Sequence, residues 1–205
     1  NITMSLICKD DETLRRTSVR KLKPLAFNLN LIQQLSELSW LPVDNNVSIA
    51  EMEQAFRSIV RTKRFSRWTD LLLVSVGNAA FCRLFNGDLW AMLTVFAATL
   101  LGFLVKQQLS RLKYNPLGVI ILSAFAASMA AACAVIFQLG STPQIALATS
   151  VLFLVPGVQM INSIMDLMHG DILMGISRGV HSIMMISCIP IGLSATMLIV
   201  GVNSL

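Results

Sequence analysis

Residues 117–137 have the sequence LGVIILSAFAASMAAACAVIF, an apolar run of 21 residues without a charged side chain. A helix needs about 20 consecutive apolar residues to cross the hydrocarbon core of a bilayer. Four further apolar runs flank this one in the chain, at Leu71–Phe81, Leu89–Val105, Ile145–Val155 and Ile183–Val202. The sequence therefore predicts an α-helical integral membrane protein with a transmembrane bundle of five spans.

Charge is concentrated in the amino-terminal third of the chain. The 205 residues are 55% hydrophobic and only 13% charged, whereas soluble domains have about 25% charged residues. Residues 1–70 carry 19 of the 27 Asp, Glu, Lys and Arg side chains. This asymmetry predicts a cytosolic region at residues 1–66 and a transmembrane domain at residues 67–205.

The amino-terminal region carries both strand and helix patterns. Residues 1–6 alternate polar and apolar side chains, the period of a half-buried strand, and residues 14–22 can form the return strand. Amphipathic helices are expected from about Asn30 to Pro42 and from a capping box that begins at Ser48. We therefore expect a small α+β cytosolic region, and because the chain opens within a strand, we expect the natural protein to begin upstream.

The positions of the basic residues predict the topology, because Lys and Arg near span ends are retained on the cytoplasmic side. A basic segment precedes the first span, and Lys106, Arg111 and Lys113 lie between the second and third spans. Residues 138–144 carry no charge, and residues 86–88 carry a single acid. We therefore expect the amino terminus in the cytoplasm and the carboxyl terminus outside, in a bacterial inner membrane.

The sequence gives no indication of an enzyme. The motifs His-Glu-x-x-His, Gly-x-Ser-x-Gly and Gly-x-x-x-x-Gly-Lys are absent from it. The four cysteines are widely separated and form no Cys-x-x-Cys pair. We interpret them as buried small hydrophobic residues, not as a disulfide framework or a zinc site. The net charge of +5 lies in basic residues beside the spans, without interleaved aromatics. We expect no cofactor, no metal and no nucleic-acid partner.

Small residues recur at intervals of four in the run at 117–137, as in the pairs Ala124–Ser128 and Ala127–Ala131. In lipid, small residues let helices approach closely. The pattern predicts tight packing of this helix, and the alternative is a surface on which helices slide or rock.

Pro156 and Gly157 interrupt the fourth apolar run. Proline removes the hydrogen bond to the carbonyl near Leu152, and glycine adds backbone freedom. In hydrocarbon, such a break persists only where neighbours or a water-filled cavity satisfy the freed backbone groups. Broken helices hold the substrate sites of transporters, whereas a simple kink is the alternative. Pro190 and Gly192 repeat the pattern in the fifth run.

Polar residues with helical spacing follow the break. Asn162, Asp166 and His169 share one face if the helix continues. Asp166 is either an interfacial carboxylate paired with Arg178 or a group that titrates for proton coupling while Arg178 binds a substrate carboxylate. Asn78 in the first span either hydrogen-bonds a neighbouring helix or lines a path. The candidate substrate and ion pathway comprises Asn78, Pro156, Gly157, Asn162, Asp166 and Arg178.

With Leu154-Val155-Pro156-Gly157 and the spaced Asn162, Asp166, Gly170 and Gly175-x-x-Arg178, the chain resembles the threonine/serine exporter family. The resemblance covers essentially the whole chain. It implies a ten-span carrier, made of one chain or of two polypeptides, and this chain is similar to the amino-terminal five-span subunit. A second membrane subunit would supply the other five spans in a hetero- or homo-oligomer. The resemblance implies export of threonine and serine or of a dicarboxylate such as succinate, driven by protons, and assigns no substrate-binding residue.

A membrane-anchored regulatory or scaffold protein without transport activity is the main alternative, and a channel is the third. The substitutions Asp166→Asn and Arg178→Ala distinguish the transporter from the scaffold protein. Under the transport hypothesis they abolish flux and leave membrane assembly intact.

Overall fold

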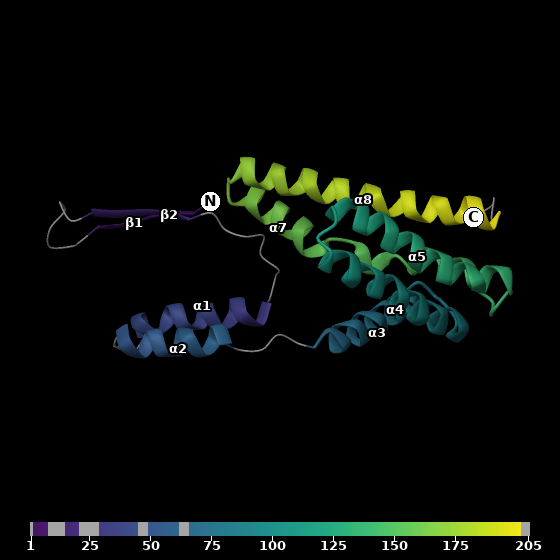
Figure 1. The fold of residues 1–205 in the computed structure, drawn as a ribbon, viewed down its shortest axis with the longest axis horizontal. Helices are drawn as coiled ribbons and strands as arrows, with labels where there is room; N and C mark the ends of the chain where they lie inside the picture. The colour runs from purple at the N-terminus through teal and green to yellow at the C-terminus, as the bar shows by residue number, and fades with distance from the viewer. Residues whose placement is uncertain (1, 8–14, 21–28, 45–48, 62–65, 202–205) are drawn as a thin grey trace. The chain divides into compact units, whose positions relative to one another are not determined.

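The computed structural model describes residues 2–7, 15–20, 29–44, 49–61 and 66–201. The chain divides into two compact units, residues 1–64 and residues 65–205 (Figure 1). We describe each unit by itself.

The first unit contains a strand pair and a helix pair. Strands β1 (Ile2–Ile7) and β2 (Arg15–Arg20) are antiparallel, with Ile2 opposite Arg20. Helices α1 (Leu29–Asp44) and α2 (Ile49–Arg61) pack against each other. These elements overlap the expected ranges, and an α+β cytosolic region remains a prediction. Helix α1 continues two residues past its predicted end, because Pro42 there removes only one helical hydrogen bond. The predicted cap, Ser48, lies outside the described residues.

The second unit is entirely helical over residues 66–201. Its elements are α3 (Arg67–Leu84), α4 (Leu89–Arg111), α5 (Pro116–Ile136), α6 (Pro143–Thr149), the short 3₁₀ helix η1 (Leu152–Leu154), α7 (Gly157–Met168) and α8 (Ile172–Val200). Figure 1 shows α8, in yellow, running beside α7 with its first half and beside α5 with its second.

Three helices of this unit, α4, α5 and α8, are long and apolar enough to cross a membrane. Residues Pro143–Leu154 and Gly157–Met168 together make a fourth candidate, bent by 58° between its two parts. Helix α3 has 18 residues, includes Arg67, Asp70 and Arg83, and is not among these candidates. By length and composition, the described residues thus contain three or four spans, and five spans remain a prediction.

The predicted interruption of the fifth span is wrong. Helix α8 runs unbroken for 29 residues with Pro190 inside it, because proline removes one hydrogen bond that packed neighbours can replace. Gly192 has a packing role instead, since a Cβ atom there would lie 2.5 Å from the carbonyl oxygen of Ile121 in α5. At a rise of about 1.5 Å per residue, α8 is about 43 Å long, which exceeds the hydrocarbon core of about 30 Å.

Helix α5 lies between α4 and α8, and its small residues form both contacts. A Cβ on Gly192 of α8 would lie 2.8 Å from Ala124 Cβ, and one on Gly102 of α4 would lie 2.7 Å from Ala127 Cβ. The contact with α8 also contains a hydrogen bond of 2.6 Å between the buried hydroxyls of Ser128 and Thr196. The tight packing predicted from the small-residue spacing is confirmed.

Two connecting loops meet at one end of the helices. The carboxylate of Asp88, after α3, accepts hydrogen bonds from the backbone N–H of Ser141 at 2.8 Å and the hydroxyl of Thr142 at 2.9 Å, both before α6. At the other end of α3, the Gln107 side chain of α4 donates to the carbonyl of Arg67 at 3.2 Å. The two loops predicted to face outward therefore lie at the same end.

Candidate functional site

The break between α6 and α7 comprises residues 150–156. Polar groups of this segment find hydrogen-bond partners within it and in α6. The Ser150 hydroxyl donates to the carbonyl of Leu147 at 2.7 Å, and the N–H of Val155 donates to the carbonyl of Leu152 at 3.1 Å. The carbonyl that the proline leaves without its usual helical partner is thus satisfied by a 3₁₀ hydrogen bond.

Asn78 of α3 completes the hydrogen bonding at the start of the break. Its amide nitrogen donates to the carbonyl of Thr149, the last residue of α6, at 3.2 Å and to the hydroxyl of Thr99 in α4 at 2.6 Å. Asn78 is only 4% exposed. One side chain therefore joins three helical elements and satisfies a carbonyl that the broken helix leaves free.

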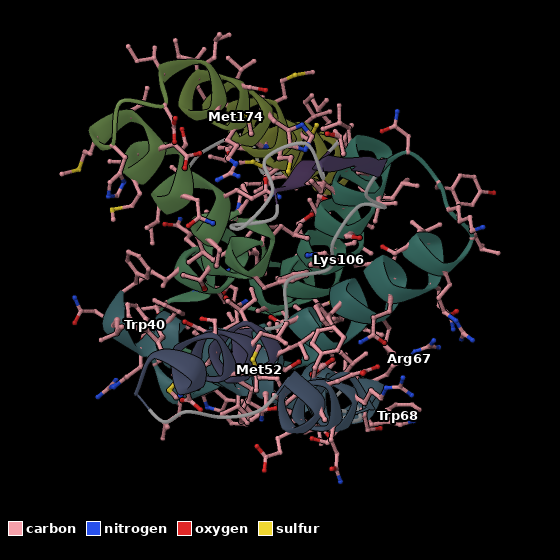
Figure 2. All side chains as sticks on the ribbon, turned by 90° about the vertical axis from the view of Figure 1, so that its left-hand side faces the viewer. Trp40, Met52, Arg67, Trp68, Lys106 and Met174 are labelled. Atoms are coloured by element: carbon pink, nitrogen blue, oxygen red, sulfur yellow. The ribbon has the colours of Figure 1, made fainter. Side chains whose placement is uncertain are left out.

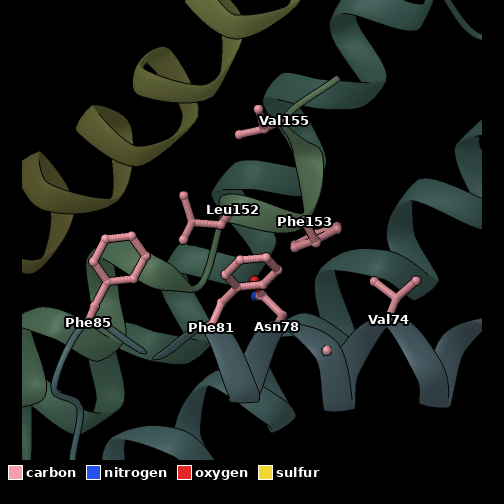
Figure 3. Close-up of a pocket in the computed structure, with 8 residues that line it drawn as sticks. Val74, Asn78, Phe81, Phe85, Leu152, Phe153 and Val155 are labelled. Carbon is pink, nitrogen blue, oxygen red and sulfur yellow. The ribbon is translucent and has the colours of Figure 1, made fainter. Parts of the chain in front are cut away.

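The break is packed on one side and open on the other. Val151 and Leu154 are buried in a cluster with residues of α5 and α8. Leu152, Phe153 and Val155 instead line a groove of about 460 Å³. The other lining residues are Val74, Gly77, Asn78 and Phe81 of α3 and Phe85 just after it. Figure 3 shows Phe81 and Asn78 rising from α3 toward the break. The groove lining is apolar except for Asn78.

Lys106 of α4 is half-buried and faces the break. Its ammonium lies 5.8 Å from the ring centre of Phe103 and 5.9 Å from that of Phe153, and the two rings meet edge to face at 6.1 Å. Figure 2 shows Lys106 toward the middle of the second unit and Arg67 and Trp68 at its edge. Sequence analysis assigned Lys106 only to the cytoplasmic flank. Lys106 lies five residues before the end of α4, and this position indicates that its side chain can lie inside the helix bundle as well as at its flank.

Asp166 of α7 and Arg178 of α8 form an ion pair across the α7–α8 turn, with 2.8 Å between Oδ2 and Nη1. The side chains are 22% and 46% exposed, respectively. Oδ2 is buried and receives no aligned hydrogen bond. The pairing is the one predicted for an interfacial carboxylate. Arg178 lies 22 residues before the end of α8 at Val200, or about 33 Å along the helix, which is close to the thickness of a hydrocarbon core.

Other polar groups of α7 lie between the break and this ion pair. The Ser163 hydroxyl donates to the carbonyl of Gly175 in α8 at 2.7 Å. The carbonyl oxygen of the Gln159 side chain is buried and has no hydrogen-bond partner in the described part of the chain. Asn162, which directly precedes Ser163, is half-buried. A polar stripe thus leads along α7 from the break to the ion pair, and two of its members contact α8.

The six predicted pathway residues fall into two groups. Asn78 lies at the break with Pro156 and Gly157. Asp166 lies about 15 Å farther along α7, where it pairs with Arg178 of α8, and Asn162 lies between. Their roles in transport stay predictions. Within residues 66–201 and the other described ranges, no cluster of three His, Cys, Asp or Glu side chains could hold a metal ion.

Comparison with known proteins gives the following matches. The family model described as "Putative threonine/serine exporter" matches residues 1–200. The protein named "Probable succinate transporter subunit YjjP" of Klebsiella aerogenes is 30% identical over 194 residues, which are 92% of this chain and 73% of that protein. The protein of the same name from Escherichia coli K12 is 33% identical over 175 residues, which are 83% of this chain and 66% of that protein. The chain thus spans about two thirds to three quarters of these relatives. No solved structure matches it.

Proposed function

Because the chain belongs to the threonine/serine exporter family, we propose that it is one subunit of a secondary exporter of small polar metabolites. This membership places it among transport proteins of membranes rather than among enzymes. The proposed substrates are threonine and serine or a small dicarboxylate, and the relatives named as subunits of a succinate transporter support the second class. The proposed location is a bacterial inner membrane.

We propose five spans, namely α3, α4, α5, the bent pair of α6 and α7, and α8. Helix α3 is about 27 Å long, close to the thickness of the hydrocarbon core. Basic residues before α3 and after α4 favour a cytoplasmic amino terminus and an outward carboxyl terminus. An odd number of spans agrees with a carrier completed by a second membrane subunit, which the word subunit in the relatives' names supports.

The observation that carries the transport proposal is the satisfied break in the fourth span. A non-helical segment at membrane depth is tolerated where it is buried in protein or lines a cavity, and residues 150–156 do both, between the buried cluster on one side and the groove on the other. Broken helices of this kind hold the substrate sites of secondary transporters and move during alternating access. The polar stripe on α7 then continues from the break to the predicted cytoplasmic boundary.

Proton coupling is proposed to arise from competition for Arg178. While Asp166 is ionised, it holds the guanidinium at 2.8 Å. Protonation of Asp166 removes this charge partner, and the arginine can then bind a substrate carboxylate. Proton binding to Asp166 and substrate binding to Arg178 would thereby be thermodynamically linked.

The test is efflux of preloaded labelled threonine, serine and succinate from cells that lack native exporters. The chain is expressed alone and with its candidate second subunit. We expect efflux only in the paired strain and its collapse with an uncoupler. Absence of efflux of all three metabolites, with membrane insertion of both chains confirmed, would favour the scaffold hypothesis, and efflux that never proceeds against a gradient would favour a channel.

A further inference from the structure

Lys106 is a cation in a membrane-length helix without an acidic partner. Among the described residues, the ion pairs are Arg57–Glu53 and Arg178–Asp166, and neither includes Lys106. Its ammonium lies over the ring faces of Phe103 and Phe153. A charge within a span is costly, and such residues mark substrate or ion paths. Ring faces compensate this cost only in part, whereas a carboxylate forms a charge-assisted hydrogen bond.

We propose that Lys106 binds a carboxylate of the exported metabolite, and that the uncompensated charge there selects a dicarboxylate over a zwitterionic amino acid. This inference rests on the proposed function and deepens it, since it names the substrate class and one binding residue.

The position of Lys106 suits a binding site in an exporter. Phe153 belongs to the break, so the ammonium is held against the segment expected to move. Lys106 lies 17 residues after Leu89, the start of α4, or about 26 Å along the helix. In the proposed topology it therefore lies within the hydrocarbon core, close to the cytoplasmic side from which an exporter takes its substrate.

A second unpartnered polar group lies at the same junction. Gly102, one helical turn before Lys106, is where α4 meets both α5 and the break, because a Cβ there would lie 3.0 Å from the Phe153 ring and 3.1 Å from the Ser123 carbonyl oxygen. The Ser123 hydroxyl is fully buried and has no hydrogen-bond partner in the described part of the chain. Buried polar groups without partners are rare in native proteins. A substrate oxygen or a bound water would satisfy this one.

The charge balance favours a dianion. An amino acid brings an ammonium that needs an acceptor, but the carboxylates of residues 66–201 are either bonded elsewhere or exposed, and none of them pairs with Lys106. Asp88 is bonded within the loops at the opposite end, and Asp166 is paired with Arg178. Asp70 and Asp171 are exposed, in the first turn of α3 and the α7–α8 turn. A dicarboxylate brings only negative charge to Lys106.

The test measures binding of labelled succinate to membranes that contain both subunits. The variants are Lys106→Met and Lys106→Arg, and Lys113→Gln is the matched control because it removes one cation from the same predicted cytoplasmic flank. We expect Lys106→Met to weaken binding about ten- to hundredfold, the usual effect of losing a hydrogen bond to a charged group. Lys106→Arg should retain most of the affinity, and Lys113→Gln should match wild type. Unlabelled succinate should compete better than threonine or the neutral diamide succinamide.

Unchanged succinate binding by Lys106→Met, stronger competition by threonine, or no binding by wild type would overturn the inference. The export assay on the same strains separates this failure from that of the proposed function. Export by wild type and by Lys106→Met with the same KM would contradict the inference alone. Lys106-dependent binding without any export would support the inference and contradict the transport function.

Discussion

At the scale of single residues, the two predicted site groups do different work. The Asp166–Arg178 pair joins the two helices of the α7–α8 hairpin and leaves one carboxylate oxygen without an aligned hydrogen bond. Asn78 has both of its donor contacts used, at the break and at Thr99. In the proposed mechanism the Asp166–Arg178 pair exchanges partners, whereas the hydrogen bonds of Asn78 are suited to holding the break in place.

Replacing Asp166 by Asn should abolish proton-driven export, because the amide cannot gain or lose the proton that releases Arg178. Arg178→Ala should abolish export by removing the proposed carboxylate ligand. Both variants should reach the membrane in wild-type amounts, because partly exposed ion pairs contribute about 1 kcal/mol or less to stability. Efflux of labelled substrate, normalised to membrane protein, measures both effects. Coupled export by both variants would show that the assigned roles are wrong.

Asn78→Ala should destabilise the second unit by about 1–3 kcal/mol, because it leaves the Thr149 carbonyl and the Thr99 hydroxyl without this partner in a buried position. The measurement is thermal unfolding in detergent. Thr94→Ala is the control, since the Thr94 hydroxyl bonds only the carbonyl of Trp90 in its own helix. Equal stability of the two variants would contradict the structural role of Asn78.

At the scale of elements, α5 packs between α4 and α8. Its small residues contact Gly102 of α4 on one side and Gly192 of α8 on the other. In such contacts, backbone proximity replaces the hydrophobic driving force that lipid removes. Separation of α5 from either neighbour by one methyl group should therefore weaken the bundle.

Gly192→Ala tests this packing directly. The new Cβ would meet the Ile121 carbonyl at 2.5 Å and the Ala124 Cβ at 2.8 Å, so we expect destabilisation of about 1–3 kcal/mol, as for overpacked cores. Gly118→Ala near the start of α5 is the matched control, because nothing lies within 4 Å of a Cβ there. Its helix propensity should leave stability equal or slightly higher. A similar fall in both melting temperatures would indicate a backbone effect instead of a contact.

The two Pro-Gly elements show where sequence reasoning succeeds and fails. Pro156-Gly157 lies where a break ends and α7 begins, whereas Pro190-Ile191-Gly192 lies inside the unbroken helix α8, although both combine a proline with a nearby glycine. The difference lies in partners distant in sequence, because Asn78 and the buried cluster support the first break, whereas the second element packs against α5. Local patterns therefore located the apolar runs and the small-residue faces, but could not decide which proline breaks a helix.

The same limit applies to the site. The Asp166–Arg178 pair was predictable because the two residues flank one short turn, so that helix geometry alone brings them together. Asn78 and Thr149 are 71 positions apart, and Lys106 meets Phe153 from another helix. Those contacts depend on how the helices pack. The sequence suggested Asn78 as a polar group but gave no indication of its partner.

At the scale of the whole molecule, the loops after α3 and α5 are held together by one carboxylate. The backbone N–H of Ser141 and then that of Ala91 hold the pKa of Asp88 below its ordinary value of 3.8. A lowered folded pKa means that the stabilisation is complete above about pH 4 and is lost as the pH falls through the folded value. Gly140 allows this contact, because its φ is +79° and a Cβ there would collide with the Asp88 carboxylate.

Asp88→Asn should therefore lower the melting temperature at pH 7, and the difference from wild type should shrink as the pH falls from about 4 through the lowered folded pKa, because the wild-type carboxylate then also becomes neutral. Unfolding in detergent across this pH range measures the effect. Asp171→Asn is the control, because Asp171 makes no side-chain hydrogen bond at the start of α8. A difference between Asp88→Asn and wild type that does not vary with pH would show that the charge of Asp88 is not responsible.

In the proposed carrier, this chain and a second membrane subunit move a small carboxylate-bearing metabolite with the proton gradient. The decisive experiment reconstitutes both purified subunits into sealed vesicles, with labelled succinate and an imposed pH gradient. We expect accumulation of succinate above its equilibrium level, dependent on both subunits and abolished by an uncoupler. Equilibration without accumulation, or no uptake by vesicles shown to contain both inserted chains, would contradict it.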